Sequence, residues 1–112
     1  PTAVMLYNSD AWCNFPLTTS FYNDMTTGLC HIHKKANMKK IPQELPFLFL
    51  YGEDDPVGGY GKTIKKLINI YIANGVQDIE EISYEGDRHE PLNEKNHEKV
   101  EADILEWIGK KL

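Results

Sequence analysis

Cysteine, long apolar runs and an excess of positive charge are all scarce or missing in this 112-residue chain. Its two cysteines, Cys13 and Cys30, form no CxxC or paired metal spacing, which predicts two reduced thiols in a reducing compartment. No apolar run approaches the length of a membrane span, and the first residues lack the basic region and apolar core of a signal peptide. We therefore expect a cytoplasmic protein without a membrane span.

The charge balance argues against a nucleic-acid partner. The chain has 12 basic and 17 acidic residues, a net charge of −5, whereas a nucleic-acid surface needs a basic face. With 41% apolar and 26% charged residues, its composition is that of a globular protein rather than a disordered one. The length corresponds to one domain at most.

The most informative stretch is PFLFLYGEDDPVGGYGKT, residues 46–63. Its unbroken apolar run at 47–51 lies between Pro46 and Gly52, which is typical of a strand buried on both faces in a parallel sheet. Such sheets place functional groups in the loops at the carboxyl ends of their strands. Three carboxylates follow this strand directly: Glu53, Asp54 and Asp55. A solvated acidic turn is the other interpretation of these residues.

The remaining elements follow from apolar side chains that recur three or four residues apart and so share a helix face. The predicted order is a helix from Thr18 or Thr19 toward Lys35, the strand at 47–51, a helix over Gly61–Asn74, a strand over Asp78–Tyr84, and a helix from Asn93 or Glu94 to Lys111. The helix stripes are Phe21, Met25, Leu29 and Ile32; Ile64, Leu67, Ile68 and Tyr71; and Val100, Ile104, Trp107 and Ile108. Residues 1–16 are expected to be loop and residues 41–46 a linker.

Two local signals mark helix ends. A threonine at 18 or 19 is a good N-cap for the first helix, and Gly75 can end the second helix in the left-handed conformation. The strand at 78–84 alternates poorly, which favours an edge position in the sheet.

The predicted topology leaves the sheet incomplete. A strand–helix–strand crossover of this length should be right-handed, with parallel strands. Two parallel strands make a poor sheet, because a first strand that is buried on both faces needs neighbours on both sides. Either copies of the chain supply those neighbours or the chain is the tail of a larger domain. We favour the second interpretation, because the chain begins at Pro1 without an initiator Met and its first residues resemble the middle of a domain.

The loops after both strands should emerge at one end of the sheet, which would bring Asp55 close to His89. A carboxylate that orients an imidazole, with the imidazole free to act as general base, is two-thirds of a nucleophilic triad. Without further information, a histidine in a polar loop is more often simply solvated.

At these residues the chain resembles the α/β-hydrolases of the lysophospholipase, monoacylglycerol lipase and S33 serine aminopeptidase-like branch. LPFLFLYGEDDPVGG, residues 45–59, is similar to their acid-bearing segment, in which a buried strand runs into G-x-x-D. GDRHEPLNE, residues 86–94, resembles their histidine loop, and residues 10–29 are similar to the tail of their lid. The resemblance implies that Asp55 is the triad acid, that His89 is the general base, and that no metal or organic cofactor takes part.

The resemblance also implies a domain organisation and a substrate class. Residues 1–40 would be the end of the lid segment with a helix, and residues 41–112 the last two strand–helix units of an α/β-hydrolase core. The substrate of the whole protein would be an acyl lipid, such as a lysophospholipid or monoacylglycerol, or a small ester; thioesters and peptides stay open. The chain has no G-x-S-x-G, and none of its serines, Ser9, Ser20 and Ser83, follows a strand and precedes a helix as a nucleophile would. We therefore expect this chain to be inactive alone.

Three other interpretations compete. A phosphate-binding loop at 58–63 would need glycine where Pro56 stands, and the carboxylates upstream would repel phosphate. A metal site has no motif: His31 and His33 point in different directions on a helix, and no spacing relates Asp54, Asp55, His89 and Glu90. His97 is expected to be solvated. A non-enzymatic module could instead bind a partner or another copy, and in either case we expect self-association through the apolar strand at 47–51.

Overall fold

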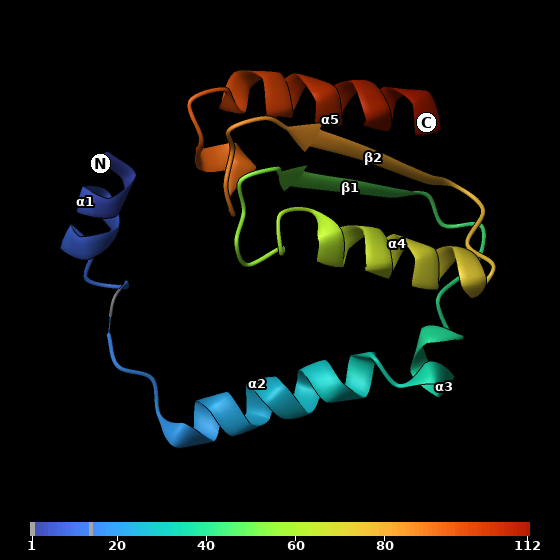
Figure 1. The fold of residues 1–112 in the computed structure, drawn as a ribbon, viewed down its shortest axis with the longest axis horizontal. Coiled ribbons are helices and arrows are strands. Elements are labelled where there is room, and N and C mark those ends of the chain that lie inside the picture. Colours follow the sequence, from blue (N-terminus) through green and yellow to red (C-terminus); the bar gives the residue numbers. More distant parts are fainter. Residues whose placement is uncertain (1, 14) are drawn as a thin grey trace. The chain divides into compact units, whose positions relative to one another are not determined.

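The computed structural model describes residues 2–13 and 15–112, and the chain divides into two compact units, Pro1–Met38 and Lys39–Leu112. The first unit contains α1 (Thr2–Ser9), α2 (Thr19–Ile32) and α3 (Lys35–Met38). The second contains β1 (Phe47–Gly52), α4 (Lys62–Ala73), β2 (Ile79–Tyr84), a 3-10 helix (Pro91–Asn93) and α5 (His97–Lys111), shown in Figure 1. No described helix has the length and apolar character needed to cross a membrane.

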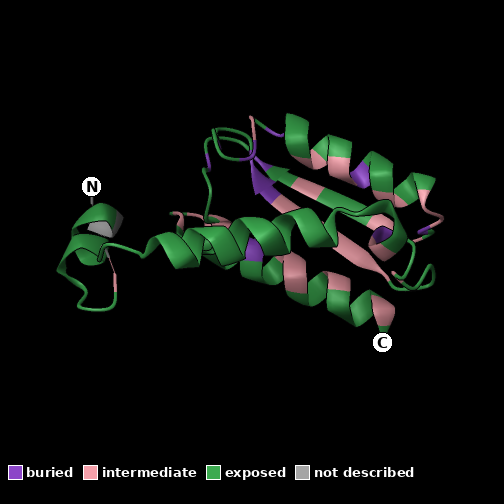
Figure 2. Ribbon diagram, turned by 90° about the horizontal axis from the view of Figure 1, so that it is seen from below, coloured by how far each residue is buried: buried purple, intermediate pink, exposed green. Residues whose placement is uncertain are grey.

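The second unit is an α/β structure built on two parallel strands, as predicted. Phe47 of β1 pairs with Ile79 of β2, and the register continues to Gly52 and Tyr84. Helices α4 and α5 lie on opposite sides of this sheet (Figures 1 and 2). Because both strands run the same way, the loops that follow them leave the sheet at the same end.

Packing against the two helices produces the core of this unit. The ring of Tyr71 on α4 meets Phe47 and Phe49 of β1 edge-on, with centroids 5.1 and 5.7 Å apart. Val100 of α5 is fully buried, and the hydroxyl of Tyr84 donates to a carboxylate of that helix.

Strand β1 is less buried than the sequence predicts. Its first four residues are half-buried, and only Tyr51 and Gly52 are buried. The expectation of burial on both faces is therefore wrong over most of the strand. The physical reason is that, in the part of the chain that the structure describes, the sheet has two strands and β1 has a neighbour on one side only.

The predicted helix signals act where expected. Thr18 caps α2, since its hydroxyl oxygen accepts the backbone N–H of Phe21 at 3.2 Å. Gly75 follows α4 with φ +93°, the left-handed conformation that glycine adopts without strain.

Three sequence predictions about helices are wrong. Residues 2–9 form α1 instead of loop, because Met5 and Leu6 favour helix and the turn-forming residues only end it. Helix α2 stops at Ile32, and the short α3 follows it separately. Helix α5 begins at His97, later than predicted, since the preceding 3-10 turn ends at Glu94 in an extended conformation, ψ 172°.

The apolar stripe of α2 is exposed rather than buried. Its members are 43–56% exposed, and α2 has no buried residue; they are Phe21, Met25, Leu29 and Ile32. Figure 2 shows that buried residues concentrate in the second unit, where the sheet and its helices supply packing partners. Burial therefore points to the second unit as the place for a preorganised site.

Candidate functional site

The loop after β1 wraps around the carboxylate of Asp55. This side chain is buried, with 5% of the residue exposed. Its Oδ1 accepts the backbone N–H of Val57 at 2.8 Å, and its Oδ2 accepts that of Gly58 at 2.8 Å. The turn is closed further by the N–H of Tyr60, which donates to the carbonyl oxygen of Asp55 at 2.8 Å. The chain thus holds this carboxylate in one orientation.

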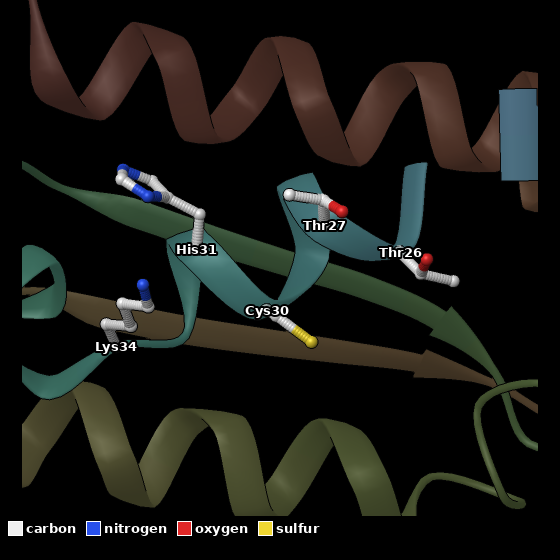
Figure 3. Close-up of a pocket in the computed structure, with 5 residues that line it drawn as sticks. All are labelled: Thr26, Thr27, Cys30, His31 and Lys34. Carbon is white, nitrogen blue, oxygen red and sulfur yellow. The ribbon is translucent and has the colours of Figure 1, made fainter. Parts of the chain in front are cut away.

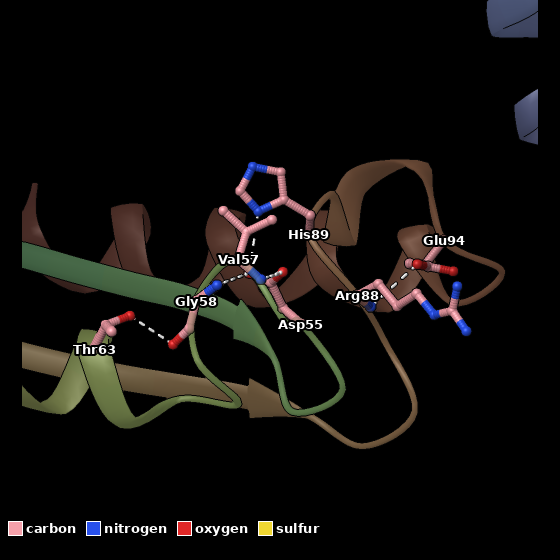
Figure 4. A network of polar contacts seen from close by, with 7 residues as sticks. All are labelled: Asp55, Val57, Gly58, Thr63, Arg88, His89 and Glu94. Atoms are coloured by element: carbon pink, nitrogen blue, oxygen red, sulfur yellow. Dashed lines mark hydrogen bonds and ion pairs between the residues drawn. The ribbon is translucent and has the colours of Figure 1, made fainter. Parts of the chain in front are cut away.

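The loop after β2 brings His89 to that carboxylate. Nδ1 of His89 lies 3.1 Å from Oδ2 of Asp55, although the two residues are 34 positions apart (Figure 4). A carboxylate only accepts hydrogen bonds, so Nδ1 carries the proton between them; in the neutral imidazole the lone pair is then on Nε2. Figure 4 shows that Nε2 points away from Asp55, and 61% of the His89 side chain is exposed. The imidazole is therefore oriented at one nitrogen and open at the other.

The electrostatics of this pair favour an ionised acid. Burial raises the pKa of Asp55, but the hydrogen bonds from His89, Val57 and Gly58 together lower it by more, so this pKa lies below its usual value. Asp55 is consequently a carboxylate at neutral pH. A fixed negative charge therefore lies beside Nδ1 of His89.

The two loops touch each other at Gly52, the last residue of β1. A Cβ atom at this position would lie 2.2 Å from the carbonyl oxygen of Asp87 and 2.3 Å from that of Arg88. The N–H of Asp54 donates to the same Asp87 oxygen at 2.9 Å. Only glycine permits this approach. In the sequence, Gly52 is the end of a strand and the first residue of G-x-x-D, and neither feature indicates this contact.

A second contact that sequence reasoning missed joins Glu94 to the histidine segment. Oε1 of Glu94 accepts the backbone N–H of Arg88 at 3.1 Å (Figure 4). Glu94 is half-buried between the 3-10 helix and α5. The only signal in the sequence is an acidic residue six positions after Arg88, too common a spacing to be informative.

The other candidate residues lie apart from this pair. The side chain of Asp54 is exposed, and the carboxylate of Glu90 accepts from the amide of Asn93 at 2.8 Å. Nδ1 of His33 lies 2.7 Å from the carbonyl oxygen of Leu29 within its own helix. Among the residues that the structure describes, no group of three or more His, Cys, Asp or Glu side chains is arranged to hold a metal ion.

A shallow hollow on α2 contains the remaining histidine candidate, His31. Its volume is about 270 Å³, and the side chains around it are exposed (Figure 3); they are Thr26, Thr27, Cys30, His31 and Lys34. The hydroxyl of Thr26 is used inside the helix, where it donates to the carbonyl oxygen of Tyr22 at 2.8 Å. The hollow thus offers little preorganised polar chemistry.

The glycine-rich turn at 58–63 does not present its amides to a ligand. The N–H groups of Val57 and Gly58 donate to Asp55, and the hydroxyl of Thr63 donates to the carbonyl oxygen of Gly58 at 2.6 Å. Oxygen atoms of the chain itself therefore accept hydrogen bonds from most of the amides that a phosphate would need. These contacts argue against the phosphate-loop interpretation.

Two comparisons relate this chain to known hydrolases. The family model of the S33 serine aminopeptidases matches residues 1–96. A highly thermostable carboxyl esterase from Bacillus coagulans, solved in complex with glycerol, superposes with a TM-score of 0.84 at 27% sequence identity. The match covers 98% of this chain and 36% of that chain, so our chain spans about a third of the esterase. The comparison with curated proteins found no match. The chain belongs to the S33 serine aminopeptidase family, and its structure corresponds to part of an α/β-hydrolase.

Proposed function

We propose that Asp55 and His89 are the acid and the general base of a serine ester hydrolase whose nucleophile lies outside these 112 residues. The observation that carries this proposal is the 3.1 Å contact between Nδ1 of His89 and a buried carboxylate, with Nε2 directed away from it. Family membership and the similarity to a carboxyl esterase support the same assignment.

In the proposed reaction, Nε2 of His89 takes the proton of a serine hydroxyl while the serine oxygen attacks the ester carbonyl carbon. The resulting imidazolium gives its proton to the leaving alcohol oxygen, and an acyl-enzyme remains. His89 then deprotonates a water molecule, which attacks the acyl-enzyme, and returns the proton to the serine. Asp55 stays ionised throughout and holds the Nδ1–H tautomer. The chemistry uses no metal or organic cofactor.

An acyl lipid or small ester is the substrate class that we propose, with lysophospholipids and monoacylglycerols as examples. Exposed apolar side chains support it, because they occur on or directly after the loops that carry the pair. Val57 and Tyr60 are 70% and 63% exposed in the loop after β1, and Leu92 is 53% exposed in the 3-10 helix that follows the His89 loop. These side chains would contact an acyl chain or the alkyl part of an alcohol.

We propose further that residues 1–40 end the lid of this hydrolase, that residues 41–112 are its last two strand–helix units, and that the protein is cytoplasmic. The first of these boundaries lies close to the division of the chain into two compact units at Met38. The short chain should be inactive alone, because it has neither G-x-S-x-G nor another serine in a nucleophile's setting.

The test is hydrolysis of a short-chain p-nitrophenyl ester by the 112-residue chain and by a longer reading frame that contains it. We expect activity in the longer product only. His89→Ala should abolish it, and Asp55→Asn should lower kcat by about 10⁴-fold, as loss of the correct tautomer does in other triads. His33→Ala is the matched control, because this exposed histidine belongs to the first unit and its Nδ1 lies 2.7 Å from the local backbone oxygen of Leu29. Unchanged hydrolysis in the His89 variant would refute the assignment.

A non-enzymatic module that self-associates is the second candidate. One observation favours it: among the described residues, β1 has a strand partner on one edge only, and its sequence FLFLYG carries no charge to discourage pairing. We propose pairing of this edge with another copy of the chain. Light scattering at tens of micromolar should then show a dimer, and a monodisperse monomer would count against it.

A further inference from the structure

The segment that carries His89 is held at few points, and one of them is not explained by the acid–histidine pair. Asp87 is fixed through its carbonyl oxygen, which accepts the N–H of Asp54 at 2.9 Å. His89 itself meets Asp55. Between them, the N–H of Arg88 donates to Oε1 of Glu94 at 3.1 Å. A side chain therefore binds the backbone directly before the histidine.

We propose that Glu94 is a positioning residue for His89, which it orients through the backbone of Arg88. This inference rests on the proposed function, since it assigns a role within the same site. The N–H of Arg88 belongs to the peptide unit between Asp87 and Arg88, so its bond to Glu94 restrains the backbone directly before His89 and with it the position of the His89 Cα. Apart from the contact of Nδ1 with Asp55, the ring is largely open, since 61% of the His89 side chain is exposed.

Glu94 is itself anchored at both of its backbone groups, which makes it a suitable support. Its N–H donates to the carbonyl oxygen of Pro91 at 3.2 Å, and its own carbonyl oxygen accepts the N–H of His97 at 3.2 Å. The first bond joins it to the 3-10 helix and the second to the first turn of α5. Val100 of that helix is fully buried, so Glu94 is connected through α5 to the hydrophobic core.

Reach, rather than charge, is what the geometry requires of this side chain. The bond uses one oxygen, Oε1, and an uncharged backbone N–H. Glutamine has the same length and an equivalent carbonyl oxygen, whereas aspartate keeps the charge but is one methylene shorter. The neighbouring carboxylate of Glu90 has the same charge but accepts from the side-chain amide of Asn93. Negative charge in this loop is therefore not sufficient to bind the backbone next to His89.

The test compares Glu94→Ala, Glu94→Asp and Glu94→Gln in the 112-residue chain, with Glu98→Ala as control. Glu98 lies in the exposed first turn of α5, and Glu98→Ala changes the net charge by the same amount as Glu94→Ala. The readout is the ¹⁵N shift pair of the His89 imidazole, which reports the tautomer. Wild type, Glu94→Gln and the control should hold the proton on Nδ1. Glu94→Ala and Glu94→Asp should shift the population toward the Nε2–H tautomer that free histidine prefers.

The positioning role would be overturned if Glu94→Ala and Glu94→Asp both kept the proton on Nδ1. It would also be overturned if Glu94→Gln lost the Nδ1–H tautomer while Glu94→Asp kept it. If the alanine variant fails to fold, the Gln and Asp pair still decides the question. In a longer, active protein, Glu94→Asp should lower kcat by about 10- to 100-fold at nearly constant KM. The tautomer measurement needs no ester hydrolysis, so failure of the positioning role is distinguishable from failure of the proposed function.

Discussion

Replacing Gly52 with alanine should push apart the two loops that carry Asp55 and His89. The added Cβ would lie 2.2 Å from the carbonyl oxygen of Asp87, 2.3 Å from that of Arg88 and 2.3 Å from the carbonyl carbon of Asp87. All three are backbone atoms, so no side chain can rotate out of the way. Since ordinary contacts begin near 3.4 Å, the histidine loop must move by about 1 Å.

That movement affects both stability and the site. Overpacking of this kind costs about 1–3 kcal/mol, and loss of the bond between Asp54 N–H and the Asp87 carbonyl adds about 1 kcal/mol. The total expected loss in the free energy of unfolding is about 2–4 kcal/mol. The same shift would lengthen the 3.1 Å contact between His89 Nδ1 and Asp55 Oδ2 beyond hydrogen-bond range.

Urea unfolding followed by circular dichroism measures the stability, and the ¹⁵N shifts of His89 measure the contact. The matched control is Gly109→Ala, because a Cβ at that exposed position of α5 meets nothing within 4 Å. There alanine should stabilise the protein by about 0.5–1 kcal/mol through helix propensity. A Gly52→Ala variant within about 0.5 kcal/mol of the wild type, with unchanged His89 shifts, would refute the packing argument.

Two further predictions concern pH. The pKa of Asp55 is lowered in the folded state, so its ionised form stabilises the protein above the ordinary carboxyl range. This stabilisation is lost as pH falls through the lowered pKa. The difference in urea midpoint between the wild type and Asp55→Asn should therefore shrink below about pH 4. Burial and the hydrogen bond to Asp103 raise the pKa of Tyr84 to about 12, so its contribution is complete below about pH 10 and is lost as pH rises toward 12. The shift corresponds to at most about 3 kcal/mol, and Tyr84→Phe should flatten the alkaline part of the stability curve. An ultraviolet titration in which every tyrosine ionises near pH 10 would contradict this.

Local sequence patterns predict the elements whose signals lie within a few residues of one another. The apolar run of β1 and the four-residue stripe of α4 identify a strand and a helix without reference to any distant residue. Thr18 and Gly75 act through neighbouring backbone groups, so their roles could be predicted too. The same patterns failed at α1 and at the start of α5. There the local preferences are weak, and contacts with the rest of the chain decide whether a helix forms and where it begins.

The sequence by itself determined that Asp55 and His89 follow two parallel strands and therefore leave the sheet at one end. The position of Asp55 in G-x-x-D had already favoured it over Asp54, but only the tertiary structure decided that its carboxylate is buried and lies at hydrogen-bond distance from the imidazole. It also decided that Gly52 must be glycine and that Glu94 reaches Arg88. The physical reason is that these contacts join segments brought together by strand pairing, and no periodicity along the chain encodes a distance between two loops.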